Sequence, residues 1–563
     1  MVLDGIYFRP YGPGCHGSRL DWSQPVAGVT VDSRLVEPGW LFLAVRGSQF
    51  DGNRFIPAAL TRGAVAVLTD NEAAVPRTET VETAVAEGRV LVVSDVRWAV
   101  ARAAANFYGH PGREMNVAGV TGTLGKTSVS HILYSILRED PYPRPPGIIG
   151  SLGIHYGDIH LPSRLTTPDA VTLQRTLAEM REAGVRVAVM EVSSHGQLQR
   201  RVDEIPFRLG VFLNLVAGEH ADVHPDFSSY VQVKSRFLSE LSPDAVLVFN
   251  HDDPGVRELV VGAHEEWRPL GYSMGLTEAG TVPAAPAAAG TAAAPATAAA
   301  AGTVVVPGSG TGAVTEMGDA AGYPLLRVTG LRLSLDGSRF TVASASPLPV
   351  VGGEERQPVH LECRLSLLGA HNVANALAAI AGALALGVPE TVIGSVLPYL
   401  KPFRRRMELI YRGDFSVLDD TTGHPRSFEA LFTTVELLRP RRLILLTAPR
   451  GNRGLDINRA NAATIAARAG RLPLAALLVT AAWDRADAAN RATEEEVAVF
   501  REELGRSGVP HIFHSELETA LQAALKEVQP GDLLVVAGTQ ALDTAAEMLR
   551  EAMGAPVLGP SRS

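Results

Sequence analysis

A glycine-rich segment between a predicted strand and a predicted helix constrains the fold of this chain more than any other feature. Residues 116–122 read NVAGVTG, which is typical of a buried strand, and residues 128–137 read SVSHILYSIL, which is typical of a helix. Between them the chain reads GVTGTLGKT over residues 119–127. Backbone N–H groups of such a loop, with the N-terminus of the next helix, form a cradle for phosphate. The segment therefore predicts a phosphate-binding loop in an α/β domain.

Lys126 and Thr127 are the residues of this loop that carry chemistry. A lysine at this position reaches terminal phosphates, and the hydroxyl beside it is a ligand for Mg²⁺. Val120 stands where the standard spacing has its first glycine, so a chance glycine-rich turn is the alternative. The combination GK[ST] at a helix start is demanding, which favours the phosphate site.

The length of the chain, 563 residues, predicts three or four domains, because one hydrophobic core does not grow to this size. Short buried-strand candidates alternate with helical segments, which indicates parallel α/β sheets. The strand candidates after the glycine-rich loop are 185–192, 208–215 and 244–250, followed by 414–420, 442–448, 474–481 and 532–539. The last four form a Rossmann-like unit, and Pro398 and Pro402 mark a boundary before it.

Composition excludes several classes of protein. The formal net charge of −9 argues against a nucleic-acid-binding protein, since such proteins present a basic face. Cys15 and Cys363 are the two cysteines, so neither a disulfide framework nor a CxxC metal motif is expected. The N-terminal residues lack the pattern of a signal peptide, and no apolar run reaches the length of a membrane span. We expect a cytoplasmic protein that binds neither membrane nor nucleic acid.

Residues 281–315 consist of Ala, Pro, Gly, Thr, Val and Ser, with no charged and no aromatic residue. The scattered Pro and Gly interrupt any helix, and the segment has little apolar area to bury. It is interpreted as a disordered surface insertion, and a docking role is the alternative.

Short motifs along the chain resemble those of the Mur ligase family, in the family's order. Residues 122–127, GTLGKT, resemble the family's GTxGKT loop, with Leu124 where the family usually has Asn. The other matches are Asp32-Ser33-Arg34 with Gly39–Phe42, Thr166-Thr167-Pro168, Glu191–His195 with Gln199 and Arg201, His220 through Lys234, Gly369–Asn375, and Arg406-Met407-Glu408. Each match is weak alone, but their common order favours the family and its MurE type.

The resemblance implies a three-domain α/β architecture. A uridine-nucleotide-binding domain is expected at residues 1–109, a central ATP-binding parallel-sheet domain at 110–402, and a Rossmann-like ligase domain at 403–563. It also implies an ATP-dependent ligase of peptidoglycan precursor synthesis, which adds an amino acid to UDP-N-acetylmuramoyl-L-alanyl-D-glutamate through an acyl phosphate. The expected partners are this UDP-linked muramoyl-dipeptide and an amino acid, and the chain is expected to be a monomer.

The catalytic candidates implied by the resemblance are Lys126, Glu191, His220 and Lys234. Thr127 and Glu191 would hold one Mg²⁺, and His220 and Lys234 would serve a second. In the family the lysine matching Lys234 is carbamylated by CO₂, which turns it into a carboxylate-like metal ligand. Taken as isolated residues, Glu191 is better interpreted as a strand-end surface carboxylate and Lys234 as a solvated helix residue. Their register with the glycine-rich loop reverses this preference and favours the metal site.

The resemblance also assigns binding residues. Those expected to bind ATP are Gly122, Thr123, Gly125, Lys126, Thr127, Ser128, Asn372, Asn375, Arg406 and Asp420. Those expected to contact the muramoyl substrate are Ser33, Thr166, Thr167, Ser193, Gln199 and Arg201. Asp420 could equally cap the next turn. His195 is interpreted either as positioning the substrate or the loop, or as a structural residue, and His224 is given no direct role.

Several positions depart from the family pattern, and most lie in the last block. Residues 480–485 read TAAWDR where diaminopimelate enzymes carry DNPR, residues 538–542 read GTQAL in place of GKGHE, and residues 450–461 also differ. Without those polar groups a diaminopimelate zwitterion would leave charges unpaired, so the added amino acid is not selected in the usual way. Gly423 occupies the position where the family usually has His, and His424 follows one place later. The stretch around His220 has one residue more than the family pattern, and Glu219 replaces the family's Asp there.

Two alternatives to the MurE-type ligase stay open. A Mur-like ligase acting on another peptide or polyamide keeps the chemistry with a different carboxylate. A second alternative is a degenerate ligase that binds nucleotide as a scaffold. The retained residues argue against it, but Leu124 and the altered last block keep it open; those retained residues are Lys126, Thr127, Glu191, His220 and Lys234. Folylpolyglutamate synthetases share the loop and the last domain, but the DSR-type first block disfavours them.

Overall fold

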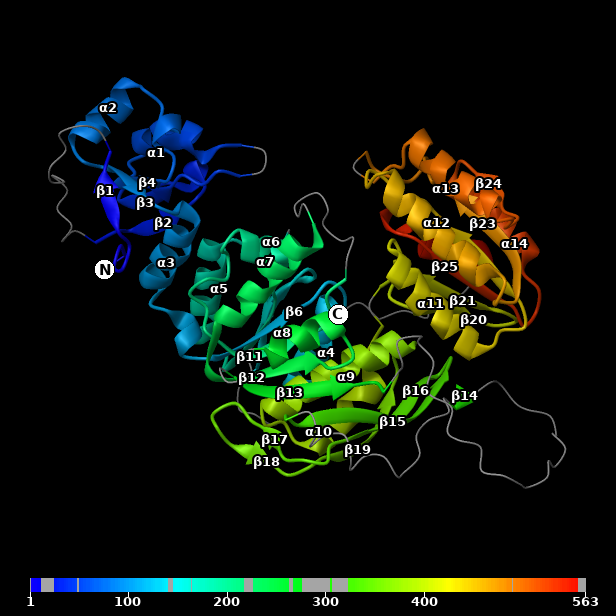
Figure 1. Cartoon of the computed structure of the whole chain (residues 1–563). Coiled ribbons are helices and arrows are strands. Elements are labelled where there is room, and N and C mark those ends of the chain that lie inside the picture. The colour runs from blue at the N-terminus through cyan, green and yellow to red at the C-terminus, as the bar shows by residue number, and fades with distance from the viewer. Residues whose placement is uncertain are drawn as a thin grey trace. The chain divides into compact units, whose positions relative to one another are not determined.

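The computed structural model describes most of the chain in two compact units (Figure 1). The described residues are 2–11, 25–47, 50–139, 145–163, 165–216, 226–262, 267–275, 304–305, 322–402, 404–488 and 490–554. The first unit comprises Met1–Gly271, Leu348–Arg356 and Ala381–Val388, and the second comprises Tyr272–Pro347, Gln357–Ile380 and Pro389–Ser563.

The N-terminal sheet of the first unit has the strand order β1-β5-β4-β3-β2, with β1 antiparallel and the other neighbours parallel. Its strands are β1 (Phe8–Pro10), β2 (Gly28–Thr30), β3 (Trp40–Leu43), β4 (Ala66–Thr69) and β5 (Val90–Val93). Its helices are η1 (Ser33–Leu35), η2 (Gly52–Phe55), α1 (Ile56–Thr61), η3 (Glu72–Ala74), α2 (Glu79–Ala86) and α3 (Val96–Tyr108). Asp95 caps the start of α3, and Gly109, with φ of 72°, ends it.

The second sheet of the first unit carries the glycine-rich loop. Its strands run in the order β13-β12-β11-β6-β10-β7-β8-β9. They are β6 (Asn116–Thr121), β7 (Gly147–Gly150), β8 (Gly153–Tyr156), β9 (Ile159–Leu161), β10 (Val187–Glu191), β11 (Phe207–Phe212), β12 (Leu241–Asn250) and β13 (Arg268–Ser273). The helices are η4 (Pro111–Arg113), α4 (Lys126–Glu139), α5 (Ala170–Glu182), α6 (Ser194–Leu198), α7 (Phe227–Ser239) and α8 (Pro254–Val261).

The central strands of this sheet are parallel and almost fully buried, which explains their continuous apolar sequences. Gly119 in β6 shows how tightly helices cover them. A Cβ at this position would lie 2.6 Å from Phe237 of α7 and 2.8 Å from Phe207 of β11. Because these aromatic side chains pack closely against β6, the end of this strand has a fixed position, and so does the start of the loop that follows it.

The second unit contains an antiparallel group and a Rossmann-like sheet. The antiparallel group is β14 (Val304–Val305), β15 (Leu325–Ser334), β16 (Gly337–Ala343) and β19 (His360–Leu365). The other sheet has the order β20-β21-β25-β22-β23-β24, with β20 antiparallel. Its strands are β20 (Glu408–Arg412), β21 (Ser416–Asp420), β22 (Leu443–Thr447), β23 (Leu474–Thr480), β24 (Ile512–His514) and β25 (Leu533–Ala537).

Helices cover both faces of the Rossmann-like sheet, and a separate hydrophobic core lies on each face. The helices are α11 (Pro425–Leu438), α12 (Leu455–Ala469), α13 (Glu494–Arg506), α14 (Leu517–Glu527), η7 (Gln540–Leu542) and α15 (Ala545–Met553). The remaining elements are the hairpin β17 (Leu348–Pro349) and β18 (Glu355–Arg356), with α9 (Ala370–Ala385), α10 (Glu390–Val396) and η6 (Leu397–Tyr399). Among the helices that the structure describes, none is long and apolar enough to cross a membrane.

The predicted α/β fold class is confirmed, but the central sheet is not purely parallel. The sheet expected to be parallel is extended by antiparallel strands, because tight hairpins join β7 to β8, β8 to β9 and β15 to β16. The last of these has the hairpin signal Asp336-Gly337, where Gly337 adopts φ of 109°. The insertion predicted at 281–315 lies outside the described residues, apart from Val304–Val305, which pair with β15.

Candidate nucleotide and metal site

The glycine-rich loop links the end of β6 to the start of α4, as predicted. Gly122 has φ of 145° and Gly125 has φ of 90°, conformations that residues with a side chain rarely adopt. A Cβ on Gly122 would also lie 2.8 Å from the Cβ of Leu213. Val120, which replaces the expected first glycine, lies inside β6, so the loop begins only at Gly122. The chain thus has a short loop of the shape that an anion cradle needs.

Asn214 holds this loop and was missed from the sequence. Its Oδ1 accepts a hydrogen bond of 2.8 Å from the Leu124 N–H, and its Nδ2 donates to the Leu124 carbonyl at 3.0 Å. Its own carbonyl accepts from the Thr123 N–H at 3.0 Å. The signal was a polar residue two positions after β11, the strand next to β6. Because both contacts with Leu124 involve its backbone, the departure from the family's Asn at this position does not alter them.

We predict that Asn214→Ala raises the KM for ATP by up to about thirtyfold, because the loop loses two hydrogen bonds of about 1 kcal/mol each. Steady-state kinetics at varied ATP concentration measures this effect. Asn250→Ala is the matched control, since Asn250 ends the neighbouring strand β12 and its side chain accepts a local hydrogen bond from the Asp252 N–H. An unchanged KM in Asn214→Ala, or an equal rise in both variants, would contradict this role.

Thr123 and Ser128 are both buried, and the side chain of Thr123 is engaged within the protein. The Thr123 hydroxyl lies 2.7 Å from the hydroxyl of Tyr230 and accepts from the Val216 N–H at 2.9 Å. These contacts fix the first half of the loop against α7.

Lys126 and Lys234 meet at the same carbonyl group. The Nζ of Lys126 donates to the carbonyls of Gly122 and Thr123, at 2.9 and 3.0 Å. The Nζ of Lys234 also donates to the Gly122 carbonyl, at 2.9 Å. Lys234 is only 1% exposed, so the interpretation of this lysine as a solvated helix residue is wrong. Burial, and secondarily the charge of Lys126, lowers the pKa of Lys234 well below that of a free lysine.

Glu191 ends β10 beside the loop and is fully buried, so it is not a surface carboxylate. Its Oε2 accepts a hydrogen bond of 2.8 Å from the Thr127 hydroxyl. Its Oε1 accepts from the Ser151 N–H at 2.7 Å, and the Ser151 hydroxyl donates to Oε2 at 3.3 Å. Gly150 makes room for this carboxylate, because a Cβ there would lie 2.3 Å from Oε1.

These side chains fit a bound Mg²⁺. A threonine hydroxyl and a carboxylate are the hard oxygen ligands that this ion prefers, and Thr127 and Glu191 already lie within 2.8 Å of each other. His220, Glu219 and His224 lie outside the described residues. Within the described ranges, no group of three or more His, Cys, Asp or Glu side chains is arranged to hold a metal ion.

The predicted substrate-contacting residues form a polar cluster continuous with Glu191, except for Ser33. Thr167 donates to the Glu191 carbonyl at 2.9 Å and accepts from the Ser193 N–H at 3.0 Å. Arg201 donates to the Thr167 carbonyl at 2.6 Å and to Gln199 at 2.7 Å. The hydroxyl of Thr166 accepts from Ser151 at 3.1 Å. Ser33 lies in η1 of the N-terminal sheet region and is buried.

Asn372, Asn375, Arg406 and Asp420 belong to the second unit. Asn372 donates to the Leu368 carbonyl at 2.7 Å and accepts from Asn375 at 3.3 Å. Asp420 accepts from the Met407 N–H at 2.8 Å, and burial raises its pKa to about 6.

The side chain that caps the helix after β21 is His424 rather than Asp420. The Nδ1 of His424 accepts from the Arg426 N–H at the start of α11. The alternative cap role considered for Asp420 is therefore wrong.

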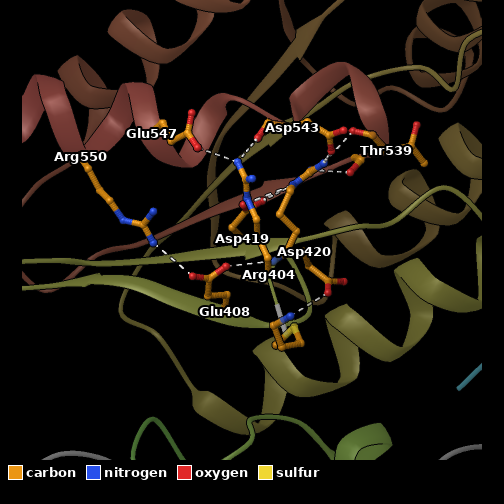
Figure 2. A network of polar contacts seen from close by, with 11 residues as sticks. Arg404, Glu408, Asp419, Asp420, Thr539, Asp543, Glu547 and Arg550 are labelled. Carbon is orange, nitrogen blue, oxygen red and sulfur yellow. Dashed lines mark hydrogen bonds and ion pairs between the residues drawn. The ribbon is translucent and has the colours of Figure 1, made fainter. Parts of the chain in front are cut away.

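A buried arginine, Arg405, braces the start of the last block and was also missed. Its guanidinium contacts Asp419 at 3.2 Å and Asp543 at 2.5 Å, and it donates to the carbonyls of Gly538 and Thr539. Figure 2 shows how Asp419, Asp420, Thr539 and Asp543 gather at one end of this sheet. Burial raises the pKa of Asp419 to about 6, with Arg405 opposing this.

We predict that Arg405→Met lowers the free energy of unfolding by about 3–5 kcal/mol, because it leaves the buried carboxylate of Asp419 unpaired. Chemical denaturation measures the change. Arg404→Met is the matched control, since Arg404 forms an exposed ion pair with Glu547 and should cost less than about 1 kcal/mol. Equal losses in the two variants would contradict the bracing role of Arg405.

Models of three domains of one family match most of the chain. The model described as "Mur ligase family, catalytic domain" matches residues 25–108, "Mur ligase middle domain" matches 120–280, and "Mur ligase, glutamate ligase domain" matches 405–540.

Two similar proteins are named UDP-N-acetylmuramoyl-L-alanyl-D-glutamate–2,6-diaminopimelate ligase. The protein of Geobacter metallireducens is 30% identical over 539 residues, covering 91% of this chain and 89% of its own length. The protein of Gloeobacter violaceus is 30% identical over 522 residues, covering 91% of this chain and 88% of its own length.

Solved structures share the fold. A UDP-N-acetylmuramoyl-L-alanyl-D-glutamate–2,6-diaminopimelate ligase matches with a TM-score of 0.61 and 20% identity, covering 95% of this chain and 96% of its own. MurF ligase from Thermotoga maritima in complex with ADP matches with a TM-score of 0.56 and 16% identity, covering 94% and 98%. With domain models and full-length relatives in agreement, this chain belongs to the Mur ligase family.

Proposed function

We propose that this ligase uses ATP to join an amino acid to UDP-N-acetylmuramoyl-L-alanyl-D-glutamate, forming an amide bond in peptidoglycan precursor synthesis. The observation that carries the proposal is the meeting of Lys126, Thr127, Glu191 and Lys234 at one glycine-lined loop. The names of the full-length relatives support the substrate. The proposed setting is the cytoplasm, with the chain acting as a monomer and binding neither nucleic acid nor membrane.

The chemistry requires activation of a carboxylate, because a carboxylate is a poor electrophile. The γ-phosphoryl group of ATP moves to the substrate carboxylate, the amine then attacks the acyl carbon, and inorganic phosphate leaves. Negative charge develops on the oxygens of the transferring group. Lys126 is positioned to stabilise that charge by turning from the Gly122 and Thr123 carbonyls toward the phosphates.

Mg²⁺ held by Thr127 and Glu191 would neutralise charge on the phosphate oxygens. Glu191 is held in place for this role by Ser151 from one side and by the Thr127 hydroxyl from the other.

Carbamylation of Lys234 is part of the proposal. Only an unprotonated amine reacts with CO₂, and burial lowers the pKa of Lys234 well below its ordinary value. A carbamate at Nζ would place an anion beside the Lys126 cation, where a protonated Lys234 would be repelled by that charge. With His220, this group is proposed to serve a second Mg²⁺.

The remaining residue assignments are proposals of the same kind. Muramoyl-substrate contacts are proposed for Ser33, Thr166, Thr167, Ser193, Gln199 and Arg201. Nucleotide contacts are proposed for Gly122, Thr123, Gly125, Ser128, Asn372, Asn375, Arg406 and Asp420. The domain boundaries 1–109, 110–402 and 403–563 are supported by the ranges of the three family models.

The identity of the amino acid is left open by the last block. Trp483 and Asp484 fall within the stretch that replaces DNPR, and both are engaged within the protein. The indole Nε1 donates to the Ala492 carbonyl at 2.9 Å, and Asp484 accepts from the Leu517 N–H at 2.7 Å. This difference favours, as the second candidate, a Mur-like ligase that uses another amino acid or another carboxylate.

The test is release of inorganic phosphate from ATP with Mg²⁺, the UDP-muramoyl-dipeptide and a panel of amino acids. Turnover that depends on both the dipeptide and one amino acid is the expected result. Turnover only with a different carboxylate substrate would favour the second candidate. Binding of ATP without turnover on any substrate would indicate a nucleotide-binding scaffold and would contradict the proposed function.

A further inference from the structure

Three arginine side chains lie in one row across antiparallel strands of the second unit. Arg339 of β16 is directly opposite Arg332 of β15 and also directly opposite Arg364 of β19. Residues opposite each other in register point to the same face of a sheet. All three arginines are exposed, whereas Phe340, the next residue of β16, is buried against the other face. The register therefore gathers three positive charges on one surface.

Like charges directly opposite each other destabilise a sheet, because their Cβ atoms lie only about 4.5–5.5 Å apart. The nearby acids do not offset this row by cross-strand pairing. Asp336, in the turn between β15 and β16, forms its ion pair with Arg412 at 2.5 Å. Glu362 of β19 lies opposite Thr341 rather than opposite an arginine. The row is thus an unfavourable arrangement for the free protein.

The same three arginines line a hollow of about 270 Å³, together with Ser334, Asp336, Gly337 and Ser338. Asp336 is the one carboxylate in this lining, and its charge is paired with Arg412. Gly337, which lines the hollow, lets β19 pack closely against this turn. It adopts φ of 109°, and a Cβ there would lie 2.1 Å from the Leu365 carbonyl oxygen. Only glycine lets the backbone of β19 approach this closely. The arginines therefore surround a concave space rather than a flat solvated face.

Guanidinium groups bind phosphate oxygens through paired N–H donors, and several in a row suit an anion with more than one phosphoryl group. We propose that this hollow is a binding site for a small oligophosphate anion, either pyrophosphate or the oligophosphate part of a nucleotide. The site uses none of the residues of the Gly122–Thr127 loop and does not depend on the proposed ligase activity. In a chain of net charge −9, such a site attracts anions only through this local cluster.

Calorimetric titration of the full chain with inorganic pyrophosphate tests this proposal, in a Lys126→Ala background that weakens binding at the glycine-rich loop. We expect one saturable site whose affinity falls at least tenfold on Arg339→Ala. Arg327→Ala is the matched control, because Arg327 is also on β15 but lies outside the hollow. Since the substitution removes repulsion, the melting temperature of Arg339→Ala without ligand should equal or exceed that of the parent.

Further titrations separate the sources of the anion. Binding of ADP as well as pyrophosphate, both lost in Arg339→Ala, would support a nucleotide as the ligand. Binding of pyrophosphate alone would support a small inorganic anion. The absence of saturable binding, equal losses in the Arg339 and Arg327 variants, or preferential binding of an acidic peptide would each overturn the proposal.

Discussion

Lys126→Ala is expected to lower kcat/KM for phosphate release by about a hundredfold to a thousandfold, which is the scale for removing a donor that stabilises transition-state charge. In the structure the Nζ of Lys126 donates to two carbonyls of the loop, so the side chain already lies over the cradle. Alanine leaves the loop intact and removes its one flexible cation. Steady-state assays of phosphate release measure the loss. The concentration of one substrate is varied at a time, while the other substrates are held at saturating concentrations.

Lys526→Ala is the control for Lys126→Ala, since Lys526 is an exposed residue at the end of α14. Its activity should equal that of the parent. If Lys126→Ala kept more than about a tenth of the parent activity, the lysine would not stabilise the transferring phosphoryl group, and the assignment of the loop would be wrong.

Lys234→Ala is expected to lower kcat by about a hundredfold or more, with partial recovery on adding formate or acetate. The physical reason is the proposed carbamate: alanine leaves a buried space beside the Gly122 carbonyl that a small carboxylate can enter. Phosphate-release assays with increasing carboxylate concentration measure the recovery. Lys126→Ala serves as the comparison, because a missing cation is not replaced by an anion.

Lys234→Met separates loss of chemistry from loss of packing, since methionine fills the buried space of Lys234 without an ionisable group. Its melting temperature should stay near that of the parent while its activity stays low. Full activity in Lys234→Ala or Lys234→Met would remove the carbamate from the proposed mechanism.

Much of the fold was predictable because its strands are buried on both faces. β6, β10, the end of β11 and the second half of β12 are buried, largely apolar runs, and each of these strands was predicted within a few residues. The antiparallel strands were missed for the opposite reason. β9 is exposed along its whole length, and β15 and β16 alternate buried and exposed residues around the Asp336-Gly337 turn.

Some polar residues of the site were predicted from the sequence and others were missed, again for physical reasons. Lys126, Thr127 and Glu191 stand at the ends of predictable elements, so their meeting followed from the order of the strands. Asn214 and Arg405 were missed because their roles depend on backbone groups far away in the sequence. No local pattern marks such a contact. The burial of Lys234 was likewise invisible, since its place on α7 indicates a solvated lysine until the packing of that helix is known.

Transfer of ¹⁸O from substrate to phosphate tests whether this protein activates a carboxylate as an acyl phosphate. UDP-muramoyl-dipeptide labelled with ¹⁸O in the D-glutamate carboxylate that is joined to the amine is turned over with ATP and the amino acid, and the released phosphate is analysed by mass spectrometry. One carboxylate oxygen must leave with the phosphoryl group, so we expect one ¹⁸O atom in each inorganic phosphate. Unlabelled phosphate formed at the rate of amide synthesis would contradict it.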